Sequence, residues 1–298
     1  MSAQLNRVRT PVLEIGYLED GDAGGTPVVL LHGFPDDALT WSKVTPALVA
    51  AGYRVLAPYV RGFGATRFLD ADTPRSGQIA AFGQDLIEFA AALGLDRYLL
   101  VGHDWGARAA YTAAALTPAR VRGLLALSVG YATSTPSAQI SVEQARAYWY
   151  QWYFGVERGR QALSADRRGF CRYLWQVWAP SWRFDETEFE ATAASFDNPD
   201  FVDIAVHSYR HRWGYEADDP RYAEVQQRMA DNPPVAVPTV MLHGDEDGAT
   251  RPETSAGKER YFTRGYRREV VAGAGHFIQR EKPQVVIDAL NSLAAQSC

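Results

Sequence analysis

VGHDWGA, residues 101–107, is the stretch of this sequence that decides the fold. An apolar run over residues 97–101 leads into it, and the small-residue run GARAAYTAAA, residues 106–115, follows with a helical composition. Asp104 therefore stands at a tight turn between a strand and a helix, with Gly102 and Gly106 two positions away on either side. Such a turn brings backbone segments too close together for side chains at those two positions. The pattern is that of a nucleophile elbow in which an aspartate replaces the usual serine.

Further strands and helices alternate on both sides of this turn. Apolar runs of strand type cover residues 28–33, 53–60, 124–130, 239–244 and 268–275, whereas residues 77–93 and 283–296 have helical patterns. Strands that alternate with helices predict an α/β fold with a mostly parallel central sheet and helices on both faces.

The alternation stops between about residues 134 and 232, where aromatic and arginine residues gather without a strong strand pattern. We therefore expect an α/β core formed by residues 1–133 and 233–298, with residues 134–232 as a helical cap inserted between core strands. Ligands bind at the carboxyl ends of the strands in parallel sheets. A cap inserted at that edge would cover the site from above.

The bulk composition excludes several classes of protein. The 298 residues carry a net charge of −5, which argues against a nucleic-acid partner. No uncharged apolar stretch is long enough to cross a membrane, and the first residues lack the apolar core of a signal peptide. The cysteines at positions 171 and 298 are expected to be free thiols. We expect a cytoplasmic protein that is a monomer or a homodimer.

Three side chains that follow expected strands have the residue types of a nucleophilic hydrolase: a nucleophile, an acid and a base. Asp104 is the candidate nucleophile, and His276 is the candidate base. Asp247 is the candidate acid, with Asp245 and Glu246 as close rivals in HGDED, residues 243–247. We prefer Asp247 because it lies deeper in its loop, from where it can reach across to His276.

The candidate oxyanion hole is formed by backbone rather than by side chains. HGFP, residues 32–35, follows another expected strand. The backbone N–H groups of Phe34 and Trp105 can converge there on one oxygen atom. These donors and the helix N-terminus favour an ionised Asp104 at rest. The bond between Phe34 and Pro35 is a candidate cis peptide.

Four motifs together resemble the α/β-hydrolase superfamily: HGFP (32–35), RGFG (61–64), GHDWGA (102–107) and GAGHF (273–277). The order nucleophile, acid, histidine is also that of α/β-hydrolases. Within the superfamily, the HGxP motif and the aspartate nucleophile resemble the epoxide hydrolase branch.

The expected cap carries two further resemblances to epoxide hydrolases. YQWYF, residues 150–154, is similar to the cap motif YQxxF, whose tyrosine binds the epoxide oxygen; this position is Tyr150. YRHRW, residues 209–213, resembles the setting of the second cap tyrosine with a shortened spacing, and this position is Tyr209. We expect an apolar, aromatic pocket wall. Its candidate members are Phe34, Trp105, Trp152 and Phe277.

An aspartate nucleophile suits a substrate that has no carbonyl group. Displacement at a saturated carbon by serine would leave an ether, which water does not cleave readily. A carboxylate leaves an ester, and its carbonyl belongs to the enzyme. The resemblance thus implies hydrolysis of a hydrophobic epoxide to a vicinal diol through an ester on Asp104, with water activated by His276 and Asp247. Neither a cofactor nor a metal is implied.

Two other readings remain open from the sequence. Haloalkane and haloacid dehalogenases share the aspartate nucleophile. Trp105 matches the haloalkane enzymes, but Phe34 stands where they have a halide-binding asparagine. Arg108 matches one arginine of the fluoroacetate dehalogenases, whose other arginine is replaced by Trp105 and whose halide-binding histidine is replaced by Gln151. A hydrolase-fold binding protein without turnover is the third reading, and steady-state turnover would discriminate it.

Overall fold

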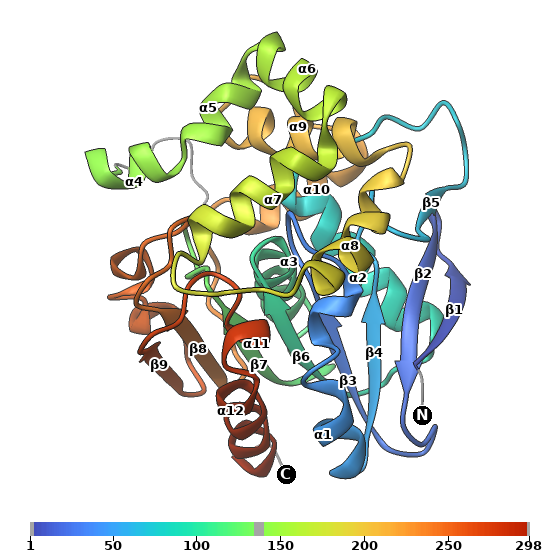
Figure 1. Ribbon diagram of the computed structural model, residues 1–298. Helices are drawn as coiled ribbons and strands as arrows, with labels where there is room; N and C mark the ends of the chain where they lie inside the picture. The colour runs from blue at the N-terminus through green and yellow to red at the C-terminus, as the bar shows by residue number, and fades with distance from the viewer. Residues whose placement is uncertain (1–2, 134–139, 297–298) are drawn as a thin grey trace.

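The computed structural model describes residues 3–133 and 140–296. Its centre is a nine-stranded sheet in the order β1-β2-β4-β3-β6-β7-β8-β9, with the short β5 paired to β2 (Figure 1). The strands are β1 (Gln4–Arg9), β2 (Leu13–Asp20), β3 (Thr26–Leu31), β4 (Tyr53–Pro58), β5 (Arg67–Phe68), β6 (Tyr98–His103), β7 (Val121–Leu127), β8 (Thr239–Gly244) and β9 (Tyr266–Val271).

The expected mostly parallel sheet is confirmed, because every pairing from β4 through β3, β6, β7 and β8 to β9 is parallel. Strands β6 and β8 are buried along their whole length, which explains their continuous apolar sequences. The antiparallel pairings lie at one edge, where β2 meets β1, β4 and β5.

Helices cover both faces of the sheet. On one face, α2 (Ile79–Ala92) and α3 (Trp105–Leu116) pack against inward residues such as Leu31 and Leu100. On the other face, α1 (Thr45–Ala50) and α12 (Pro283–Gln296) pack against Leu30 and Leu99. Successive strand residues thus point to opposite faces, and both faces are apolar.

Between β7 and β8, every regular element among the described residues is helical. These are α4 (Val142–Ala147), α5 (Trp149–Gly155), α6 (Glu157–Ala165), α7 (Arg167–Trp178), α8 (Glu186–Ala193), η2 (Ala194–Asp197), α9 (Phe201–Arg212), η3 (Pro220–Tyr222) and α10 (Ala223–Met229). Figure 1 shows α4 to α9 across one end of the sheet. Helix α10 instead lies against core helix α2, with Val225 buried beside Ala80 and Ala81.

The remaining short elements lie in loops of the core. They are η1 (Ala38–Trp41), η4 (Pro252–Ser255), η5 (Glu259–Tyr261) and α11 (Ile278–Glu281). None of the helices that the structure describes combines the length and the apolar character needed to span a bilayer.

A buried ion-pair network joins the core to helix α8. Arg280 in α11 donates to both carboxylate oxygens of Asp36, at 2.5 and 3.0 Å. The same guanidinium donates to Glu188 at 2.7 Å and to Thr192 at 2.8 Å, both in α8. Since these charges lie within the protein, each depends on its partners to offset the loss of water.

Helix α7 is fastened to three loops of the core. The indole N–H of Trp175 donates to the backbone oxygen of Pro35 at 2.8 Å. The backbone oxygen of Trp178 accepts from the N–H groups of Gly248 and His276, each at 3.0 Å. One cap helix therefore holds the loops that follow β3, β8 and β9.

Candidate active site

Asp104 occupies the sharp turn between β6 and α3. Its backbone has φ 52° and ψ −114°, a conformation that is strained for a residue other than glycine. A Cβ atom at Gly102 would lie 2.4 Å from the backbone oxygen of Gly106, and one at Gly106 would lie 2.4 Å from that of Leu31. The two glycines are thus required by close backbone approaches, as expected for a turn that presents a nucleophile.

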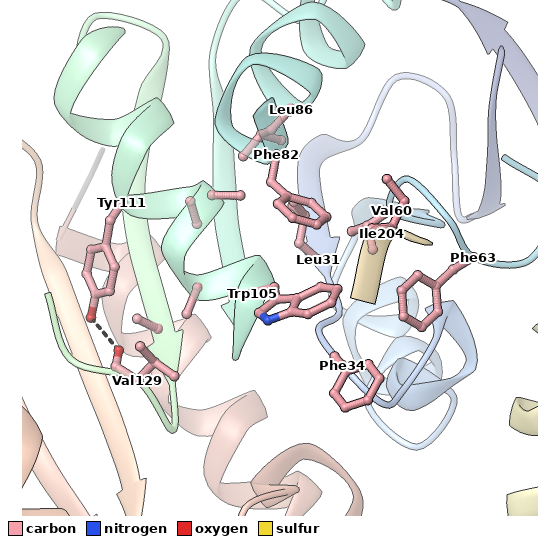
Figure 2. Close-up of a cluster of buried hydrophobic side chains, with 14 of the residues drawn as sticks. Leu31, Phe34, Val60, Phe63, Phe82, Leu86, Trp105, Tyr111, Val129 and Ile204 are labelled. Atoms are coloured by element: carbon pink, nitrogen blue, oxygen red, sulfur yellow. Dashed lines mark hydrogen bonds between the residues drawn. The ribbon is translucent and has the colours of Figure 1, made fainter. Parts of the chain in front are cut away.

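Backbone N–H groups face the Asp104 carboxylate. The N–H of Phe34 donates to Oδ1 at 3.1 Å, and the N–H of Trp105 also hydrogen-bonds this carboxylate. The bond between Phe34 and Pro35 is cis, as expected. The ring of Trp105 stacks on Phe34 and lies against Phe82 in the core (Figure 2). Core packing thereby holds both donors beside the Asp104 carboxylate.

His276 lies between two carboxylates. Its Nδ1 is 2.8 Å from Oδ2 of Asp247, and its Nε2 is 3.8 Å from Oδ2 of Asp104. The Nε2 atom is buried and has no hydrogen-bond partner among the residues that the structure describes. The backbone oxygen of His276 accepts from Ser128 at 2.6 Å, and Nε2 of His103 lies 2.9 Å from it. The imidazole is thus fixed with one nitrogen directed towards Asp104.

Of the three acids in HGDED, Asp247 is the one that contacts His276. Its second oxygen, Oδ1, accepts from the backbone N–H groups of Ala249 and Thr250, both at 2.8 Å. Asp245 instead accepts from the N–H of Gly273. Backbone donors therefore fix the Asp247 carboxylate with Oδ2 towards the imidazole.

The electrostatics couple these three groups. Burial raises the pKa of Asp104 above the usual aspartate value, although the charges of His276 and Arg108 oppose this rise. The backbone donors of Trp105 and Phe34 also oppose it and so favour the anion, as expected of them, but burial is the larger effect. Burial lowers the pKa of His276, but the carboxylates of Asp247 and Asp104 outweigh this effect and raise it. Burial disfavours the Asp247 anion, but His276 and His243 hold its pKa well below the usual range.

Tyr150 in α5 and Tyr209 in α9 come together over this group, with ring centroids 5.1 Å apart. The Tyr209 ring also lies 5.6 Å from Phe34. Burial, together with the charge of Asp104, raises the pKa of both phenols far above the usual value. Gln151 donates to the Tyr150 oxygen at 2.7 Å, whereas the buried Tyr209 hydroxyl makes no hydrogen bond of good geometry with the described residues. Both phenols therefore keep protons that they can donate.

Of the four expected members of the pocket wall, Trp105 lines the cavity described below, whereas Phe34, Trp152 and Phe277 do not. Trp152 packs on Trp213 at 4.5 Å between centroids, and its indole N–H donates to the backbone oxygen of Ala145 at 2.8 Å. Trp152 shares no ring contact with the tyrosine pair. Phe277 is fully buried, 5.3 Å from the His276 ring, and supports that histidine from within the core.

A cavity of about 290 Å³ opens beside Trp105 and Tyr209, between α2, α3, α9 and α10. Arg108 and Arg212 also line it. Sequence reasoning did not bring Arg212 to the site, although Tyr209 and Arg212 are three residues apart on one helix and so share a face. Among the described residues, no group of three or more His, Cys, Asp or Glu side chains is arranged to hold a metal ion.

Comparisons with known proteins agree on one fold. The family model for the alpha/beta hydrolase fold matches residues 26–283. Epoxide hydrolase A of Mycobacterium tuberculosis is 27% identical, with 95% of this chain and 94% of that protein aligned. A crystal structure from Klebsiella pneumoniae, provisionally assigned as an epoxide hydrolase, has a TM-score of 0.94 and 38% identity and covers 98% of this chain and 97% of its own. Epoxide Hydrolase A from Mycobacterium thermoresistibile has a TM-score of 0.76 and 25% identity, over 98% of each chain.

Proposed function

This chain belongs to the α/β-hydrolase fold family, in its epoxide hydrolase branch, and from that premise we propose that it converts a hydrophobic epoxide to a vicinal diol through a covalent ester on Asp104. The observation that carries the proposal is the pairing of two protonated phenols, Tyr150 and Tyr209, with a buried aspartate nucleophile. A carbonyl substrate needs no acid at this position, whereas an epoxide oxygen does.

The first step opens the ring. Oδ2 of Asp104 attacks one epoxide carbon, the carbon–oxygen bond breaks, and its electron pair goes to the epoxide oxygen. Tyr150 and Tyr209 hydrogen-bond that oxygen, and one of them transfers its proton. General acid catalysis of this kind contributes about 10²–10⁴-fold in rate.

The second step hydrolyses the ester. Nε2 of His276 takes a proton from water, and the resulting hydroxide attacks Cγ of Asp104. Oδ1 becomes the oxyanion and accepts from the N–H groups of Phe34 and Trp105, both of which hydrogen-bond this carboxylate in the free enzyme. The bond between Cγ and Oδ2 then breaks, and the leaving alkoxide takes the proton from His276. The new carboxyl group returns its proton to the tyrosinate, so the enzyme is regenerated.

Ester formation itself prepares the base. The negative charge of Asp104 is one cause of the raised pKa of His276 in the free enzyme. Alkylation removes that charge, so the pKa of His276 falls when the ester forms. The imidazole is therefore neutral, and able to accept a proton, at the stage that requires it.

The experiment that tests this function exploits the origin of the oxygen atoms. In a single turnover of styrene oxide with excess enzyme in ¹⁸O-water, the diol should be unlabelled and the peptide containing Asp104 should gain one ¹⁸O. His276→Ala should accumulate a protein species heavier by the mass of the epoxide, and Asp104→Ala should form neither adduct nor diol. Labelled diol in the first turnover would contradict the covalent route.

A dehalogenase that uses the same nucleophile is less well supported. In the fluoroacetate dehalogenases, a tryptophan indole N–H helps to hold the departing halide, and the matching residue here, Trp152, donates to Ala145 instead. Assaying free halide from fluoroacetate, chloroacetate and a bromoalkane beside the diol assay separates the two activities. Halide without diol would favour the dehalogenase.

The sequence-based division of the chain is part of the same proposal. Residues 134–232 form the cap and residues 1–133 and 233–298 form the core, which the helical character of α4 to α10 supports. We also propose a cytoplasmic location, which the buried free thiol of Cys171 supports. The partner is the small-molecule substrate, and the protein acts as a monomer or a homodimer.

A further inference from the structure

The cavity beside Trp105 and Tyr209 carries two positive charges. Arg108 in α3 is buried, and its guanidinium donates to the Thr133 hydroxyl at 3.2 Å. Arg212 in α9 is partly buried and donates to the backbone oxygen of Thr133 at 3.2 Å and to the Tyr148 hydroxyl at 3.3 Å. Both arginines line the cavity, together with Trp105. A ligand in this cavity would therefore contact two guanidinium groups, close to Trp105, which follows the nucleophile in the chain.

Burial disfavours both charges, although the phenols of Tyr148, Tyr150 and Tyr209 outweigh it at Arg212 and raise the pKa of that guanidinium. Burial and the charge of Arg212 together lower the pKa of Arg108 to about 10, against the opposing effect of Asp104. The contacts of Arg212 are with neutral groups, including the Tyr148 ring at 4.7 Å from its guanidinium carbon. No carboxylate among the described residues forms an ion pair with Arg212. Two like charges in a partly dehydrated space favour the binding of an anion.

Other buried arginines of this chain are compensated by acids. Arg61 donates to both oxygens of Asp85 at 2.6 Å, and Arg280 is held by Asp36 and Glu188. Within the ranges that the structure describes, Arg212 has no such acidic partner, and in this it differs from Arg61 and Arg280.

Resting on the proposed function, we infer that the substrate is an epoxide that bears a carboxylate, and that this carboxylate binds between Arg108 and Arg212. The apolar part of the ligand packs against Ile79, Tyr131 and Met229, which line the same cavity. Arginine forks bind carboxylates through two parallel hydrogen bonds. A volume of about 290 Å³ lies at the lower end of ligand pockets, so the substrate is a small, mainly apolar epoxy acid.

The alternative is that Arg212 is purely structural and ties α9 to Thr133 and Tyr148. A structural role predicts that substitution of Arg212 affects all substrates alike. A carboxylate-binding role predicts that substitution affects acidic substrates selectively. The ratio of two kcat/KM values, one for an acid and one for its neutral amide, distinguishes these roles.

The test compares para-carboxystyrene oxide with para-carbamoylstyrene oxide, which have nearly the same shape. The wild-type enzyme should prefer the acid by about 10–100-fold in kcat/KM, the range for a hydrogen-bonded charge. The ratio should collapse towards one in Arg212→Gln and in Arg108→Gln, and Arg212→Lys should retain part of it. Arg228→Gln is the matched control, because Arg228 lies on α10 but is half exposed and pairs with Glu224; its ratio should equal that of wild type.

A wild-type ratio near one, or a ratio that survives in both glutamine variants, would overturn the inference while leaving the epoxide hydrolase function intact. If neither epoxide is hydrolysed, the proposed function fails, and binding decides the inference separately. Calorimetric titration with para-ethylbenzoate and para-ethylbenzamide should then show tighter binding of the acid by wild type and Arg228→Gln, but not by Arg212→Gln. Equal binding of the two compounds by wild type would refute the carboxylate site.

Discussion

Asp247→Asn should separate the two steps of the reaction. In the wild type, Oδ1 of Asp247 accepts from the N–H groups of Ala249 and Thr250, and Oδ2 accepts from Nδ1 of His276. The asparagine oxygen will keep the Oδ1 position, because the two N–H groups require an acceptor there. Its NH₂ group then faces Nδ1, which can only accept, so the imidazole proton moves to Nε2. Nε2–H cannot take a proton from water.

The magnitude follows from the loss of the general base. General base catalysis is worth about 10²–10⁴-fold. Each tenfold is about 1.4 kcal/mol, so the barrier to ester hydrolysis should rise by roughly 3–5 kcal/mol. Ester formation uses Asp104 and the tyrosines, and its rate should change by less than about tenfold. The ester should therefore become the predominant enzyme species during turnover.

The assay is rapid quench with styrene oxide, followed by intact-protein mass and by diol release. Asp245→Asn is the matched control, because Asp245 lies two residues away and accepts from Gly273 instead of contacting His276; both rates should stay within about twofold of wild type. If Asp247→Asn slowed diol release without accumulating the ester, the reasoning would be refuted. An equal decrease in the rates of ester formation and ester hydrolysis would also refute it.

The pH dependence of ester hydrolysis by the wild type is a second test of the role of His276 as the general base. The pKa of His276 is raised in the free enzyme, and His276 must be neutral to activate water. Diol release from the preformed ester should therefore be full above the pKa of His276 and be lost as the pH falls through it. Since the ester lacks the charge of Asp104, this loss should occur at lower pH than the protonation of His276 in the free enzyme, followed by NMR. Coincident midpoints would contradict the electrostatic coupling.

Four further substitutions test the remaining parts. Tyr209→Phe and Tyr150→Phe should each slow ester formation, by up to about 10²–10⁴-fold, without slowing hydrolysis of the preformed ester; single-turnover adduct formation at the wild-type rate would contradict this role. Gly106→Ala would place a Cβ atom 2.4 Å from a backbone oxygen and should cost about 1–3 kcal/mol or more in denaturant unfolding, so an unchanged midpoint would contradict the close approach. Arg280→Met leaves the Asp36 carboxylate buried without its ion pair and should cost roughly 3–5 kcal/mol, measured by the same unfolding, and a loss below about 1 kcal/mol would show that the network is not needed.

The core of the fold was predictable because its strands are buried on both faces. Residues 239–244 and 283–296 form β8 and α12 with the expected bounds, since continuous apolar runs and helical spacing mark them directly. The hairpin of β1 and β2 was not predicted. Strand β1 is largely exposed and carries arginines that pair with Glu14, so burial leaves little pattern in its sequence.

The candidate site was predictable where a residue follows a strand, and less so in the cap. Asp104, Asp247 and His276 each lie in a loop that follows a strand, and the carboxyl ends of these strands lie at the same edge of the sheet. Two differences in the cap follow from helix phase. Trp152 is two positions from Tyr150 and therefore faces away from it, whereas Arg212 is three positions from Tyr209 and faces the same way. Arg212 and Arg108 line the same cavity because α9 packs near α3. This packing is tertiary and leaves no pattern that could be recognised in a single sequence.

The attachment of α7 bears on how such enzymes diversify. Trp175 and Trp178 bind the backbone beside the oxyanion turn, the acid and the histidine at once. A cap exchanged by recombination would bring a foreign helix to all three loops and would shift the catalytic groups along with the pocket wall. Lineages descended from this architecture are thus expected to change selectivity by point substitutions in α5 and α9, and to inherit α7 together with the loops it holds.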